Sequence, residues 1–428
     1  MESMLDTGNT AWVLTAAAMV LLMIPGLALF YGGMVRSKSV LNMLMMVMSA
    51  AFVVMILWVL FGYSMAFGTD IGGLIGDPVE YLGLESLMAD DPEAGLPAMA
   101  FVAFQAMFAA LTVGLIAGAV ADRTKFGAWL VFGAVWAIIV YFPVAHWVWS
   151  AGGWIFELGV IDFAGGTAVH INAGAAALAL AIVIGRRVGW PKTPMRPHNL
   201  TLVMLGAGLL WFGWFGFNAG SALAANNAAS VVFVNTFAAT AAAALAWLIV
   251  EKVRDGHATT LGAASGIVAG LVAITPACAS VSPVGAIIVG VVAGALCALA
   301  VGWKYNLGYD DSLDVVGVHL VGGLVGTLLI GFLATEVAPT GVNGLLYGGG
   351  AEQLGKQAIG AFAVLFYSLI VAAILALIIK AVRGFRVSTD DEVSGIDLAV
   401  HAESGYELGD SGGGGHFAGV GQRSLGRE

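Results

Sequence analysis

The chain has 428 residues, of which 60% are hydrophobic and only 10% are charged, and its formal net charge is −10. A soluble domain carries about a quarter charged residues, so this composition predicts a protein that crosses a membrane many times. The negative charge comes mostly from the connection 67–97 and from the tail, and neither resembles a nucleic-acid-binding surface.

Eleven apolar runs follow one another along the chain, each near the ~20 residues that a bilayer core requires. They cover residues 10–35, 40–66, 98–121, 126–146, 165–185, 199–221, 228–250, 259–275, 283–303, 315–335 and 357–382. The predicted fold is therefore an all-α polytopic membrane protein, with a membrane domain over 1–386 and a tail over 387–428. The first run is long enough to span and lacks a basic leader, so no cleavable signal peptide is expected.

Basic residues follow every second span, which predicts the orientation through the positive-inside rule. They are Arg36, Lys38, Arg123, Lys125, Arg186, Arg187, Lys192, Arg196, Lys252, Arg254, Lys304, Lys380, Arg383 and Arg386. The alternate connections 67–97, 147–164, 222–227 and 276–282 contain no Lys or Arg, and only Lys356 falls on the opposite side. We expect a multi-pass protein of the cell membrane with its N-terminus outside and its C-terminus in the cytoplasm.

The connection 67–97 is acidic, through Asp70, Asp77, Glu80, Glu85, Asp90, Asp91 and Glu93. This charge could enrich cations near a pore mouth, or the segment could be a solvated loop only. Cys278 and Cys297 lie in or beside apolar spans and form neither a disulfide framework nor a metal-ligand spacing. No cofactor or metal is expected.

Two histidines lie inside predicted spans, His170 in the fifth and His319 in the tenth. Ionisable side chains at membrane depth are rare and usually line a pathway or pair with another polar group. They could also simply join helices through a hydrogen bond. Each follows an aspartate, Asp162 or Asp314, and each precedes a glycine by four residues, so a small neighbour on the same helix face should leave room beside the ring.

Spans one to five and six to ten behave as two halves, and span eleven is left over. Because five is odd, the second half must be inverted, and inverted repeats place substrate sites near the midplane between the halves. The two imidazoles would then approach each other at mid-membrane. The aromatic block 211–221, which ends in Asn218 and Ser221, also puts polar groups at membrane depth.

After Arg386 the chain becomes polar and acidic, and from Asp410 it is rich in glycine and expected to be disordered. About forty residues are too few for a further catalytic or signalling domain.

Several motifs in the chain closely resemble the ammonium transporter family (Amt/Mep, with the Rh proteins as relatives). They are Ile24-Pro-Gly-Leu-Ala-Leu-Phe-Tyr-Gly-Gly, Phe104-Gln-x-x-Phe108, Asp162-Phe-Ala-Gly-Gly-Thr-x-Val-His170, Gly213-Trp-Phe-Gly-Phe-Asn-Ala-Gly-Ser221, Asp314-Val-x-Gly-Val-His319 and Gly395-Ile-Asp-Leu-Ala-Val-His401. The resemblance runs over nearly the whole chain. It implies an eleven-helix homotrimer in which each subunit has its own conduction path for ammonium or methylammonium.

The resemblance also implies a role for each matching residue. Trp149 and Ser221 would recruit the cation at the outer mouth, with Phe108 beneath them and Asp162 holding the site in shape. Phe108 and Phe217 would form a stacked gate, and His170, His319 and Trp214 would line the pore. Trp149 together with Ser221 favours an Amt-type transporter over an Rh-type channel.

The tail motif, with Gly395, Asp397 and His401, resembles the element that couples subunits and meets PII-type signalling proteins. Ala399 occupies the position of a phosphorylated threonine in plant members, so control by that phosphorylation is not expected.

Elementary chemistry agrees with a transport role. Aromatic faces attract a cation by ~0.5–2 kcal/mol, and the Ser221 hydroxyl offers a hydrogen-bond acceptor. Beyond two phenyl rings a full cation would lose its hydration at a high cost. We therefore hypothesise that ammonium loses its proton near the gate, that ammonia moves along the imidazoles, and that the histidine pair relays the proton.

Two other classes of function stay open. An ammonium sensor would bind the same cation and signal through the tail without much transport. An intramembrane hydrolase would need a nucleophile activated by a base, for which Ser150 or Ser265 could be imagined. The sequence has no Gly-x-Ser-x-Gly motif, so we expect that the protein is not an enzyme.

Overall fold

The computed structural model describes residues 5–89 and 95–406, so the acidic positions 90–93 and the glycine-rich end of the tail lie outside the described residues. The described residues contain eleven helices long and apolar enough to cross a membrane. The predicted polytopic fold is confirmed. A single two-residue hairpin, β1 (Asp70–Ile71) with β2 (Ile75–Gly76), is the departure from all-α structure within the described part of the chain.

Four of the first five spans begin and end near the predicted positions, and the fourth extends further. They are α1 (Thr7–Met34); α2, η1 and α3 (Val40–Phe67); α4 and η3 (Ala98–Val120); α5, η4, α6 and α7 (Phe126–Glu157); and η5 with α8 (Gly166–Ile184). The fourth is longer than the predicted 126–146, because α6 (Phe142–Trp149) continues to Trp149 and the short helix α7 (Trp154–Glu157) follows it.

The second set of spans follows the same order. They are α9 (Leu200–Gly220), α10 (Asn227–Asp255), α11 (Thr260–Ala277), α12 with α13 (Pro283–Leu307) and η6 with α14 (Val316–Leu333), followed by the eleventh, α15 (Glu352–Arg383). The tail adds α16 (Thr389–Ser394) and a π-helical turn, η8 (Asp397–His401).

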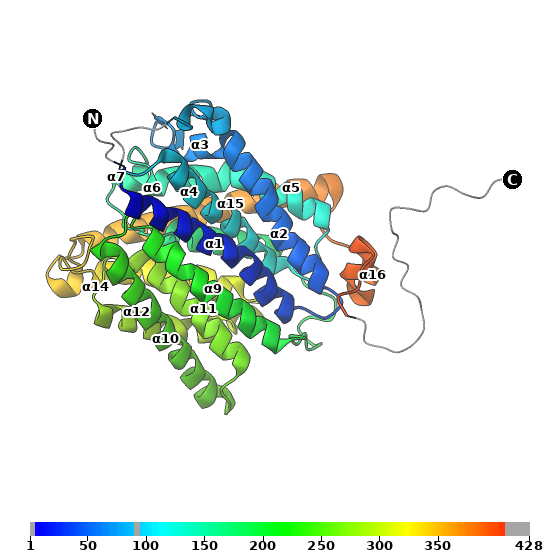
Figure 1. The fold of residues 1–428 in the computed structure, drawn as a ribbon. Helices are drawn as coiled ribbons and strands as arrows, with labels where there is room; N and C mark the ends of the chain where they lie inside the picture. The colour runs from blue at the N-terminus through cyan, green and yellow to red at the C-terminus, as the bar shows by residue number, and fades with distance from the viewer. Residues whose placement is uncertain (1–4, 90–94, 407–428) are drawn as a thin grey trace.

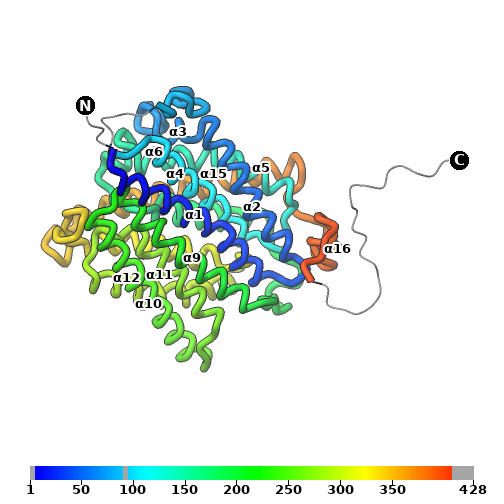
Figure 2. Tube along the Cα trace, viewed as in Figure 1, coloured from blue at the N-terminus to red at the C-terminus, as the bar shows by residue number. Residues whose placement is uncertain are grey.

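The helices form one bundle in which the first helices of the two sets, α1 and α9, pack along each other (Figure 1). Their contact is close because glycines face the partner: a Cβ atom at Gly206 would lie 2.3 Å from the Phe30 nitrogen, and one at Gly33 2.7 Å from the Asn199 oxygen. We call the end where α1 begins the N-terminal face and the end where α16 lies the tail face (Figure 2).

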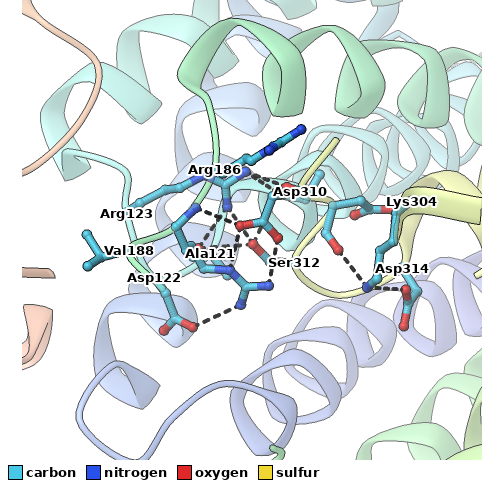
Figure 3. A network of polar contacts seen from close by, with 12 residues as sticks. Ala121, Asp122, Arg123, Arg186, Val188, Lys304, Asp310, Ser312 and Asp314 are labelled. Carbon is cyan, nitrogen blue, oxygen red and sulfur yellow. Dashed lines mark hydrogen bonds and ion pairs between the residues drawn. The ribbon is translucent and has the colours of Figure 1, made fainter. Parts of the chain in front are cut away.

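A buried network of charges joins the tail-face ends of several helices (Figure 3). Arg187 donates to Asp310 at 2.8 Å and to Asp122 at 3.3 Å. Arg123, fully buried, donates to the backbone oxygens of Ala119, Ala121 and Asp310. Burial lowers the pKa of Arg123 to about 10, so it stays charged at neutral pH. The network fixes the segments that follow α4, α8 and α13 relative to one another.

Asp310→Asn is expected to destabilise the protein by about 3–5 kcal/mol, because the variant leaves Arg187 buried without its main counter-ion. Burial opposes ionisation of Asp310, but hydrogen bonds and charge from Arg187 outweigh it and lower the pKa of Asp310. The stabilisation should therefore persist at neutral pH and be lost only as the pH falls through that lowered pKa. Thermal unfolding in detergent measures the effect. Asp255→Asn breaks an exposed Arg254–Asp255 pair and should leave unfolding unchanged; equal shifts in both variants would contradict the account.

Candidate functional site

The two span histidines meet inside the bundle. His170 lies in η5 (Gly166–Ile171) and His319 in η6 (Val316–Leu320), and both are buried. Their Nδ1 atoms are 3.2 Å apart, and their ring centroids are separated by 5.3 Å. One Nδ1 must donate and the other accept, so the neutral rings hold opposite tautomers. The predicted approach of the two imidazoles is observed.

Each histidine occupies a π-helical turn that opens its span. Such turns are rare and often mark functional sites, because the wider turn changes the direction of the side chains. The buried Nε2 of His170 has no hydrogen-bond partner among the described residues. A buried nitrogen of this kind is ready to meet a small polar molecule.

Glycines allow the two histidine segments to cross closely. A Cβ atom at Gly174 would lie 2.5 Å from the Leu320 nitrogen, and one at Gly323 would lie 3.2 Å from the His170 Cβ. Each glycine thus makes room for the opposite segment.

Asp162 holds the start of η5. Its carboxylate accepts four backbone hydrogen bonds of 2.6–3.0 Å, from Gly165, Gly166, Thr167 and Ala168. These are N–H groups that a helix start leaves without intrahelical acceptors. Because the carboxylate is fully occupied, Asp162 shapes this turn and supplies negative charge without reaching the histidines.

The matching residue in the second half is Asp311. It accepts from the backbone nitrogens of Val315 at 3.1 Å and Val316 at 2.7 Å. Asp314, which the sequence motif suggested, instead pairs with Lys304 at 2.6 Å. Asp311 precedes His319 by eight residues, as Asp162 precedes His170. This equal spacing is the signal that could have identified it.

A stack of aromatic rings lies beside the histidines, on the side toward the N-terminal face. Phe108 of α4 and Phe217 of α9 stack at 4.1 Å between centroids with a 23° angle between their planes. Phe217 lies 6.1 Å from the His170 ring, and Trp214 stacks on His170 at 5.4 Å. All of these rings are buried. The pair of phenyl rings therefore separates the imidazoles from the N-terminal face.

The aromatic block of α9 divides according to the helical period. Trp214 and Phe217, three residues apart, face the histidines, whereas Phe212 points outward with 55% of its surface exposed. Thr275 of α11, which the sequence did not single out, fixes Trp214 by accepting its indole N–H at 2.8 Å.

Trp149 and Ser221 lie between the phenyl pair and the N-terminal face. Trp149, the last residue of α6, packs edge-on against Phe108 at 5.9 Å and donates its indole N–H to the Asp162 backbone oxygen at 3.0 Å. Ser221 ends α9 and donates to the Phe217 oxygen at 2.8 Å, which leaves its lone pairs free to accept. Both side chains are partly exposed. Aromatic faces and a hydroxyl acceptor suit a small cation that can donate hydrogen bonds.

The tail residues form a separate cluster on the tail face. The Asp397 carboxylate accepts from the backbone nitrogens of Leu41 at 3.0 Å and Asn42 at 2.7 Å, at the start of α2. His401 lies 3.1 Å from Asn42 Oδ1, and Gly395 has a left-handed backbone with φ of 131° against Lys38. These side chains do not approach the histidine pair directly.

Glu392 is the tail residue that the sequence analysis missed. It is almost wholly buried, accepts from the Val188 nitrogen at 2.6 Å and pairs with Arg386 at 2.6 Å. Val188 follows Arg187 of the buried network, so the tail is fastened to the same segment that holds Asp310.

Comparisons with known proteins all find ammonium transporters. A sequence model described as the Ammonium Transporter Family matches residues 11–406. An ammonium transporter of Mycobacterium tuberculosis is 63% identical, over 94% of this chain and 91% of its own length. One from Aquifex aeolicus is 48% identical, over 95% of both chains.

Solved structures agree with the sequences. Mep2 of Saccharomyces cerevisiae superposes with a TM-score of 0.83 at 37% identity, covering 91% of this chain and 89% of its own. A structure described as a sensor Amt protein gives a TM-score of 0.86 at 32% identity, covering 93% and 99% of the two chains.

Proposed function

The chain belongs to the ammonium transporter family, and from this premise we propose that its buried aromatic and histidine column is the path by which ammonium nitrogen crosses the cell membrane. The observation that carries the proposal is the continuity of the column. Trp149, Phe108, Phe217, His170 and His319 follow one another with centroid separations of 4.1–6.1 Å.

The first step is recruitment of ammonium at the outer mouth. Trp149 and Phe108 offer aromatic faces, and Ser221 offers a hydroxyl acceptor directed at a donor N–H. Potassium has a similar size but no N–H, so the hydroxyl favours ammonium. Asp162 keeps the turn below in shape and adds a negative charge near the entrance.

The second step is loss of the proton at the stacked gate. Behind Phe108 and Phe217 the path is lined by buried rings, where an unpaired cation would lose its hydration at a high cost. Neutral ammonia would instead meet the unpartnered Nε2 of His170. The hydrogen-bonded histidine pair would relay the released proton, because each ring can accept on one nitrogen while donating from the other.

Uptake of labelled methylammonium into proteoliposomes tests the function directly. We expect saturable uptake that ammonium competes for, and potassium does not. Uptake equal to that of protein-free liposomes would contradict the proposal.

We also propose the architecture that this mechanism needs. Three features support an inverted repeat of spans one to five and six to ten: the α1–α9 pair, the crossing of the two π-helical turns, and the equal Asp-to-His spacing of Asp162 and Asp311. The basic residues on the tail face support a cytoplasmic tail and an outer N-terminus. A homotrimer, with membrane lipid around it, follows the family.

The second candidate function is sensing. The docked tail favours it, because a segment fastened through Glu392 and Asp397 could report on the membrane domain to a PII-type partner. A tail-intact variant that no longer takes up methylammonium but still signals would support sensing without transport. We propose no enzymatic role, since the relatives are named as transporters.

Asp397→Ala is expected to release the tail, because the start of α2 loses two acceptors. Loss of such a cap costs about 1 kcal/mol or more, so the population of released tail should rise about fivefold or more. The rate of cleavage after Glu392, which is buried in the docked tail, by a Glu-specific protease measures the released population. Asp390→Ala, on an exposed part of α16, should cleave at the wild-type rate; equal rates for the two variants would contradict this docking.

A further inference from the structure

An apolar crevice of about 690 Å³ lies on the bundle surface near the tail face, away from the proposed path. Its walls come from the second half of α8, with Leu178 and Ile182, and from η6 and α14, with Val316, Leu320 and Leu324. The segment from Val316 to Leu324 is about 12 Å long at the helical rise. The crevice is therefore a lateral groove between spans five and ten.

Arg186 is the one charged residue among the described residues that line the crevice. It follows the end of α8, is exposed, and donates its Nε hydrogen to the Gly308 oxygen at 2.8 Å. Its guanidinium lies 5.2 Å from the centroid of the Trp190 ring. In the part of the chain that the structure describes, its two Nη groups donate to no acceptor. A guanidinium presents five N–H donors, so four stay available to an anion.

The surroundings place this crevice at the boundary between hydrocarbon and headgroups. Lys380 donates to the Val183 oxygen, and Arg386 lies 3.9 Å from the position of a Cβ atom at Gly185. Trp190 and Tyr305 stack at 5.7 Å, and amphipathic aromatic rings gather at membrane interfaces. Below this band Ile182 exposes 61% of its surface, as expected for a side chain in lipid.

We propose that the crevice binds one anionic phospholipid of the cytoplasmic leaflet, with an acyl chain between α8 and α14 and its phosphate on Arg186. The apolar walls match a hydrocarbon chain, and the cationic rim matches the charge of the headgroup. An extended peptide would have to leave polar backbone groups unpaired against those walls. The acyl chain of the bound lipid would contact Val316 and Leu320, which lie on the turn that carries His319.

The test is lipid binding, so it is independent of whether the protein transports ammonium. Native mass spectrometry of the purified full chain, titrated with palmitoyl-oleoyl phosphatidylglycerol or the matching phosphatidylcholine, gives an affinity for each bound lipid. Arg186→Gln should weaken the tightest phosphatidylglycerol site about tenfold, and Arg186→Lys should weaken it less. Leu178→Trp, which fills the groove, should abolish that site, with thermal unfolding as the check on folding.

Arg383→Gln is the matched control, because this exposed arginine lies in the same basic band but does not line the crevice. It should bind like the wild type. The proposal is overturned if Arg186→Gln and Arg383→Gln weaken binding equally, if phosphatidylcholine binds as tightly as phosphatidylglycerol, or if inorganic phosphate alone displaces the lipid.

Discussion

Replacing either His170 or His319 by alanine is expected to reduce the ammonium-evoked current by about tenfold or more. The 3.2 Å contact between the Nδ1 atoms is the one hydrogen bond that the described residues provide between the two rings, and either substitution removes it. The remaining imidazole then has no partner to receive the proton. Solid-supported-membrane electrophysiology on proteoliposomes of equal protein content measures the change.

His257→Ala is the control for this experiment. His257 lies in the exposed connection between α10 and α11, far along the chain from both spans. Its variant should give the wild-type current. Unchanged current and unchanged selectivity over potassium in both pore-histidine variants would remove the proton relay from the mechanism.

Asp162→Ala is expected to have the largest effect on folding. The variant leaves four backbone N–H groups without acceptors, at Gly165, Gly166, Thr167 and Ala168, in a buried region. An unsatisfied buried donor costs about 1–3 kcal/mol, so the combined loss should be about 4 kcal/mol or more. The η5 turn and the position of His170 would be lost with it.

The yield of monodisperse protein and its thermal unfolding in detergent measure this loss. Asp6→Ala provides the comparison, because Asp6 caps α1 by accepting from one nitrogen, that of Asn9, and its loss should cost about 1 kcal/mol. If the Asp162 variant were no less stable than the Asp6 variant, the four hydrogen bonds would not have the structural role assigned to them.

Hydropathy was sufficient to predict the membrane spans, because every helix that crosses the bilayer needs an apolar segment about as long as the hydrocarbon core is thick. The errors lie where local geometry decides the end of a helix. The helix α6 continues to Trp149, three residues beyond the predicted end of the fourth span, which places that ring at the mouth of the column. The β1–β2 hairpin has only two residues in each strand and gives no periodic signal.

The aromatic and histidine residues that the sequence singled out lie together in the structure, but the residues that support them were missed. The positions of His170 and His319 in the fifth and tenth predicted spans were enough to predict that the two rings approach each other. The helical period explains why Trp214 and Phe217 share a face. Asp311 and Glu392 were missed, because their importance comes from hydrogen bonds to backbone nitrogens at helix starts or in loops. Contacts of this kind depend on the folded path of the chain and leave little pattern in the sequence.

The most direct test compares ammonium and potassium pulses on wild-type proteoliposomes in the same solid-supported-membrane cell. A path that accepts the cation at Trp149 and Ser221 and passes its nitrogen and proton separately should give a saturable current with ammonium and none with potassium. Equal currents with the two ions, or an ammonium signal no larger than that of protein-free liposomes, would contradict the account.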